Sequence, residues 1–268
     1  MVRTIYLLKA SYLTARTYKV DWYASVIYPI INILPVIIAI WYGSHIGLFD
    51  NFIEKIGTDN VFGYYAIGLV YWNYVEMLWP AVLTFRNYMR IGFFEDIFLT
   101  PITISEYLTG YTFLMVFIVT IQSLPLIIGI IPVLIFSSQI INVLIVMGIF
   151  VLSIFASYGF AYFLFGVTLR IKEGDEVVSI LGNIAPLLGG LYFPITILPM
   201  PLKICSYIFP FTWAMDIIRG LLFQATTIFP IDIEIFMFIL MSLFYFFLGV
   251  LAFRYLESSS RKMGLQGF

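Results

Sequence analysis

Side chains able to carry out chemistry are few in this sequence. His45 is the only histidine and Cys205 the only cysteine among the 268 residues. A metal site or a Cys–His nucleophile pair needs several such groups held together, and single residues of each type do not supply them. One cysteine also excludes a disulfide within the chain. We therefore expect no catalytic residue and no metal site.

A phosphate-binding loop is absent as well. No G-x-x-x-x-G-K-[ST] segment occurs in the sequence, and this is the loop whose backbone cradles the phosphates of ATP. The chain therefore cannot hold ATP in that way. We expect no cofactor in this chain and no enzymatic activity of its own.

The densest group of charges lies in residues 86–107, RNYMRIGFFEDIFLTPITISEY, between two apolar runs. Pro101 disfavours helical geometry at Thr100, so a short helix over 87–101 is expected to end there. The next apolar run then begins with a capping box, T-I-S-E at 103–106. The segment is predicted to form a short helix, a sharp turn and a long helix.

Phenylalanines accompany these charges. Phe93, Phe94 and Phe98 are too apolar for a solvated loop, so they need a partner surface or a membrane interface. Glu95 and Asp96 would orient such a contact, but exposed ion pairs contribute only about 0–1 kcal/mol, so the rings should contribute more. The alternative is an ordinary solvated loop whose charges face water.

The composition indicates the setting of this segment. Hydrophobic residues make up 62% of the chain and charged residues 11%, and the mean hydropathy is +1.02. Soluble domains are about half apolar and about one quarter charged. We interpret the chain as an all-α integral membrane protein.

Six apolar segments are long enough to cross a bilayer, whose core of about 30 Å needs about 20 helical residues. Together they form one transmembrane domain over 22–268. Residues 1–21 are too polar to span, and their helical spacing of apolar and basic residues predicts an interfacial amphipathic helix; a disordered basic tail is the alternative. The predicted spans are 24–46, 61–82, 106–131, 140–169, 177–194 and 233–254.

The distribution of basic residues predicts the orientation. Of the 14 Lys and Arg residues, 11 lie on one side of this topology, and Lys55, Lys203 and Arg219 lie on the other. Positive charge concentrates on the cytoplasmic side of membrane proteins. Both termini and residues 86–107 are therefore predicted to be cytoplasmic.

The segment 195–231 is apolar but interrupted by prolines, including Pro199 and Pro210, and it follows Pro194. Prolines break the helical ladder, and broken backbone exposed to lipid is not tolerated at membrane depth. We predict an outer re-entrant hairpin of two short helices between the fifth and sixth spans. Asp216 and Arg219, three residues apart on its second helix, can pair on one face. Such a pair would hold an outer gate or merely stabilise the helix.

Glu76 is the one acid inside a predicted span and away from its first turn. Acids within a membrane are costly and usually face a cavity or a partner. It can line a substrate path, titrate, or pair with a basic group; the alternative is that it snorkels to the interface. Small residues recur every four positions at Ser153, Ser157 and Ala161, a spacing that permits close helix approach.

Three motifs in order resemble those of type-2 ABC exporter permeases. Residues 90–101, R-I-G-F-F-E-D-I-F-L-T-P, are similar to the family's R-x-G-x-x-E-x-L-x-x-[ST]-P. Residues 193–199, F-P-I-T-I-L-P, resemble F-P-I-x-x-L-P. Residues 210–219, P-F-T-W-A-M-D-I-I-R, resemble P-L-T-x-x-x-D-x-x-R. The departures are Phe93-Phe94, where the family often has Thr-Leu, and Asp96, which doubles the acid.

The resemblance implies a six-helix subunit that pairs with a second permease subunit, in a homodimer or a heterodimer. It also implies separate ABC ATPase subunits that bind ATP and Mg²⁺, and no nucleic acid partner. The first motif would be the coupling helix seated on the ATPase, and the other two would form the outer gate. The residues assigned to coupling are Arg90, Gly92, Phe94, Glu95, Asp96, Phe98, Thr100 and Pro101, and those assigned to the gate are Pro194, Pro199, Pro210, Thr212, Asp216 and Arg219.

These observations predict a permease subunit of an ATP-driven exporter for a hydrophobic or amphipathic substrate, which can be drug-, lipid- or glycan-like. The alternative is a proton-coupled secondary transporter with Glu76 as its titrating group. A scaffold or intramembrane enzyme is disfavoured, because the spans contain no catalytic cluster. Heavy use of Ile, Tyr and Phe is typical of an AT-rich prokaryotic genome, so we expect the plasma membrane of a prokaryote.

Overall fold

The computed structural model describes residues 50–92, 99, 104–137, 139–168, 174–191 and 194–263, and isolated positions between 27 and 43. Regular structure in these residues is helical, and no strand occurs among them. The predicted all-α class is confirmed. The interfacial helix predicted over 1–21 lies outside the described residues, and so does most of the span predicted over 24–46.

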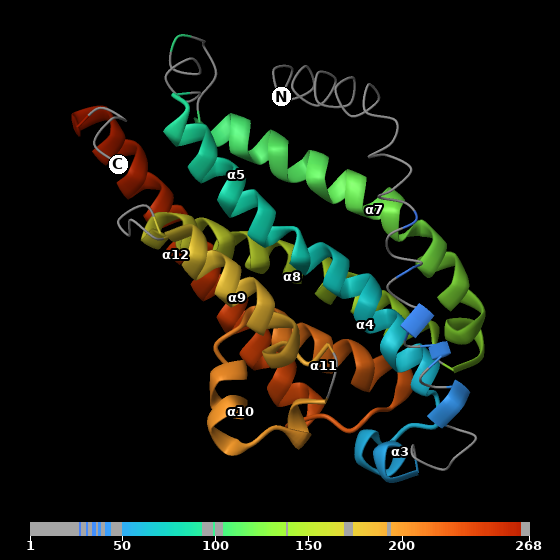
Figure 1. Ribbon diagram of the computed structural model, residues 1–268. Helices are drawn as coiled ribbons and strands as arrows, with labels where there is room; N and C mark the ends of the chain where they lie inside the picture. Colours follow the sequence, from blue (N-terminus) through green and yellow to red (C-terminus); the bar gives the residue numbers. More distant parts are fainter. Residues whose placement is uncertain are drawn as a thin grey trace.

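Three helices are long and apolar enough to cross a membrane (Figure 1). They are α7 (Ile104–Ser137), α8 (Ile140–Thr168) and α12 (Ile231–Met263). They correspond to the spans predicted at 106–131, 140–169 and 233–254. The molecule is thus a helical protein with three candidate membrane-spanning helices among its described residues.

The span predicted over 61–82 is not one uninterrupted helix. It consists of α4 (Val61–Glu76) and α5 (Leu78–Arg90), which meet at Met77 and follow one another along nearly one line (Figure 1). Pro80 explains the interruption, because proline has no N–H for the carbonyl four residues earlier and its ring clashes with that carbonyl. That carbonyl belongs to Glu76. The helix resumes after the break and continues eight residues beyond the predicted end.

The span predicted over 177–194 also differs from the structure. Helix α9 (Gly174–Leu188) has 15 residues, which at 1.5 Å per residue give about 22 Å, less than the roughly 30 Å of a bilayer core. Gly190 then adopts a φ of 77°, the left-handed conformation that ends many helices. A single helix through 194 is therefore wrong.

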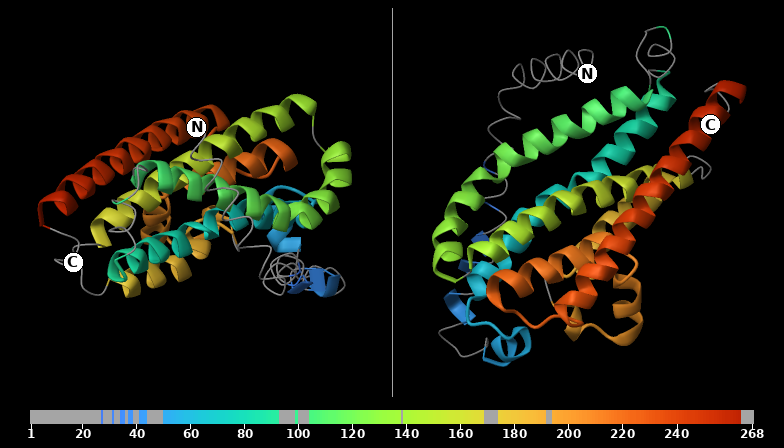
Figure 2. Two further views of the ribbon diagram at one scale, coloured as in Figure 1. Left: turned by 90° about the horizontal axis from the view of Figure 1, so that it is seen from above. Right: turned by 180° about the vertical axis from the view of Figure 1, so that it is seen from behind.

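Short helices gather at one end of the molecule. They are α3 (Asp50–Ile56), the 3₁₀ turn η1 (Ile195–Ile197), α10 (Met200–Ser206) and α11 (Pro210–Phe223). Two helices thus occupy the segment predicted as a hairpin, and its re-entry into the membrane stays a prediction. The Arg90 end of α5 and the C-terminal end of α12 lie at the opposite end (Figures 1 and 2). We call these the α11 end and the α5 end.

The packing of α8 on α12 depends on two glycines. A Cβ at Gly159 would stand 2.6 Å from the carbonyl oxygen of Tyr245, and a Cβ at Gly249 would stand 2.6 Å from that of Gly159. No side chain fits at either position without moving the backbone. Ser153, Ser157 and Ala161, predicted to allow close helix approach, are buried on the same helix.

Candidate functional site

Arg219 connects several segments at the α11 end of the molecule. Its side chain is only 2% exposed, and its guanidinium donates hydrogen bonds to three backbone carbonyls. Nε reaches the oxygen of Tyr64 at 3.1 Å, Nη2 reaches that of Leu191 at 3.2 Å, and Nη1 bonds that of Gly190. The guanidinium carbon also lies 3.9 Å from the centre of the Tyr64 ring. We call Arg219 and these carbonyls the carbonyl clamp.

The carbonyl clamp ties α11 to the C-terminal end of α9 and to the start of α4. The last carbonyls of a helix lack partners within it and carry partial negative charge, so a cation there is favourable. Space for the guanidinium comes from Gly68, because a Cβ there would collide with Nη2 of Arg219. Thr212 adds a long contact to the same helix end, from its hydroxyl to the oxygen of Leu188 at 3.4 Å.

Asp216 does not pair with Arg219, so the predicted ion pair is wrong. Among the described residues, the ion pairs join only Arg86 and Arg90 to Asp175. The Oδ2 atom of Asp216 instead accepts a hydrogen bond from the N–H of Ile228 at 2.9 Å. Burial raises the pKa of Asp216 above its ordinary value. Spacing along one helix suggested the pair, but the carbonyl groups of two other segments compete successfully for the guanidinium.

The gate prolines position these elements. Pro210 is the first residue of α11, where proline is well tolerated because its missing N–H would have no helical partner. Pro199 precedes α10, and Pro194 precedes η1. Five of the predicted gate residues are buried, and Pro199 is exposed. The gate residues therefore lie in one region of the fold, while their gating role stays a prediction.

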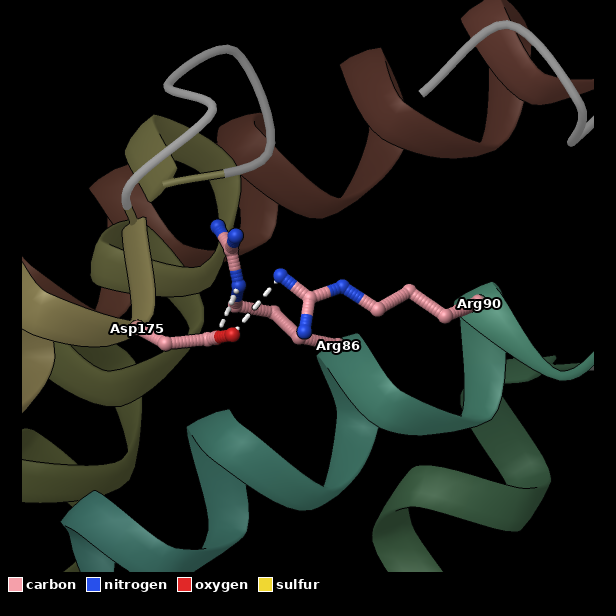
Figure 3. A network of polar contacts seen from close by, with 3 residues as sticks. All are labelled: Arg86, Arg90 and Asp175. Atoms are coloured by element: carbon pink, nitrogen blue, oxygen red, sulfur yellow. Dashed lines mark hydrogen bonds and ion pairs between the residues drawn. The ribbon is translucent and has the colours of Figure 1, made fainter.

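A second cluster lies at the α5 end. Asp175, in the first turn of α9, forms ion pairs with two arginines of α5 (Figure 3). Nε of Arg86 lies 2.6 Å from Oδ1 of Asp175, and Nη2 of Arg90 lies 2.7 Å from Oδ2. The Arg86 side chain is 7% exposed and that of Arg90 is 56% exposed. We call this cluster the arginine bridge. The sequence reasoning missed Asp175, although its position at a helix N-terminus favours an acid.

The coupling helix predicted over 87–101 does not start at residue 87. Asn87–Arg90 is the last turn of α5, and Ile91 and Gly92 form a turn in which Gly92 has a φ of 75°. A helix that starts at 87 and runs through 101 is therefore not formed. Of the predicted coupling residues, only Arg90 and Gly92 are described. Phe94, Glu95, Asp96, Phe98, Thr100 and Pro101 lie outside the described residues.

Between the two clusters, α5 and α9 run side by side and expose polar residues. The Trp79 ring, at the start of α5, packs against Gly182 in the middle of α9. Glu76 is exposed at the α4–α5 break and has no ion-pair partner among the described residues. The exposed polar residues on the two helices are Asn87, Arg90, Glu176, Ser179 and Asn183.

The exposed stripe of α9 has two edges. Glu176, Ser179 and Asn183 follow one another at helical spacing on one edge, and Ile180, Ile184 and Leu187 do so on the other. Exposed polar side chains within membrane helices usually face a water-filled cavity or a protein partner. If it lies at membrane depth, the polar edge of α9 is therefore poorly suited to lipid.

Metal binding finds no support in the described part of the chain, where no group of three His, Cys, Asp or Glu residues is placed to hold an ion. Comparison of the sequence with models of known protein families and with curated proteins finds no match. The functional argument therefore depends on the residues themselves.

Proposed function

We propose that this chain is the permease subunit of an ATP-driven exporter, resembling the type-2 ABC permeases. Two permease subunits would form a path for a hydrophobic or amphipathic substrate, and separate ATPase subunits on the cytoplasmic side would bind ATP and Mg²⁺. The membrane would be the plasma membrane of a prokaryote, with both termini in the cytoplasm.

The observation that carries this proposal is the exposed face of α5 and α9. Its polar edge, with Glu176 and Asn183, would be costly against lipid but suits a path with water and a second subunit. Its apolar edge, with Ile184, suits an amphipathic substrate or close subunit contact. A scaffold protein that meets lipid all round would have no need of such a face.

The arginine bridge supports a link between this face and the cytoplasmic partner. Arg90 is the last residue of α5, and the predicted coupling segment follows directly. Its ion pair with Asp175 connects that segment to α9. A displacement of the coupling segment would therefore reach both helices of the face, because two packed helices joined by ion pairs move together.

The test is to purify the chain with and without its ATPase subunit and measure ATP hydrolysis and binding of that subunit. We expect no hydrolysis by the chain alone. Substituting Glu95→Ala and Phe98→Ala together should weaken ATPase binding or uncouple hydrolysis from transport. The double variant Glu54→Ala with Ile208→Ala is a matched control, since it removes an exposed acid and an exposed apolar side chain at the opposite end. Unchanged coupling in the first variant, or ATP-driven transport without a partner, would contradict the proposal.

A proton-coupled transporter is the second candidate, and one observation favours it. Glu76 is exposed at the helix break with no ion-pair partner among the described residues. In that case the purified chain would carry its substrate under a pH gradient without ATP, and Glu76→Gln would abolish this transport. Under the exporter proposal, Glu76→Gln leaves ATP hydrolysis coupled, although substrate affinity can change.

A further inference from the structure

The connection between α11 and α12 is held by two acids. Oδ2 of Asp216 accepts the N–H of Ile228, and Oε1 of Glu234 accepts the N–H of the next residue, Phe229, each at 2.9 Å. Both acids are buried, Asp216 at 6% exposure and Glu234 at 0%. One acid comes from each helix, so together they fix the chain where it passes from α11 to α12.

The two carboxyl groups also lie close together, because they accept hydrogen bonds from the N–H groups of two consecutive residues. Ionised carboxylates only accept hydrogen bonds, so two of them cannot bond to each other, whereas a protonated carboxyl donates to its neighbour. Oε2 of Glu234 is buried and has no hydrogen-bond partner among the described residues. A proton on one of the two carboxyl groups satisfies this geometry and removes the repulsion between like charges.

Charge balance favours the same state. Arg219 is the cation nearest this pair, and its hydrogen bonds go to carbonyls, so its positive charge is not neutralised within the carbonyl clamp. Two ionised carboxylates and one guanidinium would leave a net charge of about −1 buried, which is costly. One shared proton makes the cluster neutral. The other titratable groups that face it are the phenols of Tyr64 and Tyr207, which are neutral at ordinary pH.

We propose that Asp216 and Glu234 form a proton-binding site that fastens α11 to α12 at the α11 end of the molecule. One proton is held between the two carboxyl groups, and the backbone N–H groups of Ile228 and Phe229 hold their outer oxygens. When the proton leaves to water, the site gains one negative charge, the carboxylates repel each other, and the 224–230 connection loosens. This site is separate from the α5–α9 face and does not depend on the proposed transport function.

The proposal predicts the direction of a pH effect. Burial raises the pKa of Asp216, so the folded state binds protons more tightly than the unfolded state. The stabilisation is then complete at low pH and is lost as the pH rises through the range in which the pair releases its proton. The midpoint of thermal denaturation of the purified chain should therefore fall as the pH is raised through that range.

Infrared difference spectroscopy of the purified full-length chain tests the site directly. The wild-type protein should show a carboxylic-acid C=O band that disappears when the pH is raised. Both Glu234→Gln and Asp216→Asn should abolish this band, because the amide then donates to the remaining carboxylate. They should also flatten the pH dependence of thermal denaturation. Asp232→Asn is the control, since it removes an exposed acid in the same turn of α12 and should leave both signals unchanged.

The other results overturn the proposal. A band that persists in both variants, or that does not respond to pH, shows that the pair holds no proton. A band lost in one variant only shows that a single acid holds the proton alone. If either variant fails to fold, isotopic labelling of aspartate and glutamate in the wild-type chain replaces it. Labelling each type in turn should shift the band, and a band that neither label shifts contradicts the shared site.

Discussion

The two ends of the molecule hold their arginines in different ways. At the α11 end, Arg219 is buried and its partners are backbone carbonyls of two other segments. At the α5 end, Arg86 and Arg90 share the side chain of one residue, Asp175, and Arg90 is more than half exposed. Backbone partners move only with their helices, whereas an ion pair between side chains can break and form again. The carbonyl clamp therefore suits a fixed joint between helices, and the arginine bridge suits a joint whose ion pairs can exchange.

The largest effect should come from removing the carbonyl clamp. Arg219→Met removes the side-chain donor from three carbonyls and the nearest cation from the Asp216–Glu234 pair. We expect the free energy of unfolding to fall by about 3 kcal/mol or more. Arg219→Lys should recover part of this loss, because an ammonium group keeps the charge but lacks the planar fork of donors. Thermal denaturation in detergent measures both. A midpoint unchanged in the Met variant would show that the clamp is not a fixed joint.

A smaller effect should follow from crowding the same joint. Gly68→Ala places a methyl group against the guanidinium of Arg219 and should cost about 1–3 kcal/mol. Gly148→Ala is the matched control, because a Cβ there has no neighbour within 4 Å, and alanine in a helix is favoured over glycine by roughly 0.5–1 kcal/mol. Equal denaturation midpoints for the two variants would contradict the close fit between Gly68 and Arg219.

The smallest effects should appear at the arginine bridge. Arg90→Ala removes an exposed ion pair and should cost about 0–1 kcal/mol, with the loss shrinking as salt is added. Asp175→Asn should cost more, because it also removes the carboxylate from the buried Arg86. Denaturation midpoints at low and high salt compare the two variants. If Arg90→Ala cost as much as Arg219→Met, the contrast between a fixed and an exchangeable joint would be wrong.

The long helices were predictable because composition and length alone determine them. The predicted spans at 106–131, 140–169 and 233–254 all lie within, or nearly coincide with, observed helices. The signal for the α4–α5 break was also present, since Pro80 removes a hydrogen bond four residues back. Proline alone does not decide the outcome, however, because Pro125 and Pro132 lie inside α7 without ending it.

The polar clusters were less predictable, because partners far apart in sequence compete for the same group. Asp216 and Arg219 have a spacing typical of a pair, yet Arg219 binds carbonyls of Tyr64 and Gly190, and Asp216 accepts the N–H of Ile228. Spacing along one helix identifies only the possible partners on that same helix. Which distant carbonyl or acid comes within reach depends on the packing of α4, α9 and α12, which the sequence pattern alone does not specify.

The facing glycines of α8 and α12 restrict how this sequence can change over time. A Cβ at Gly159 would meet the backbone of Tyr245 on α12, and a Cβ at Gly249 would meet the backbone of Gly159 on α8. A substitution at either position pushes the two backbones apart, and a second substitution at the partner position cannot restore the contact, because both changes add atoms. Replacement by larger residues at this crossing is therefore excluded, because either backbone would have to move.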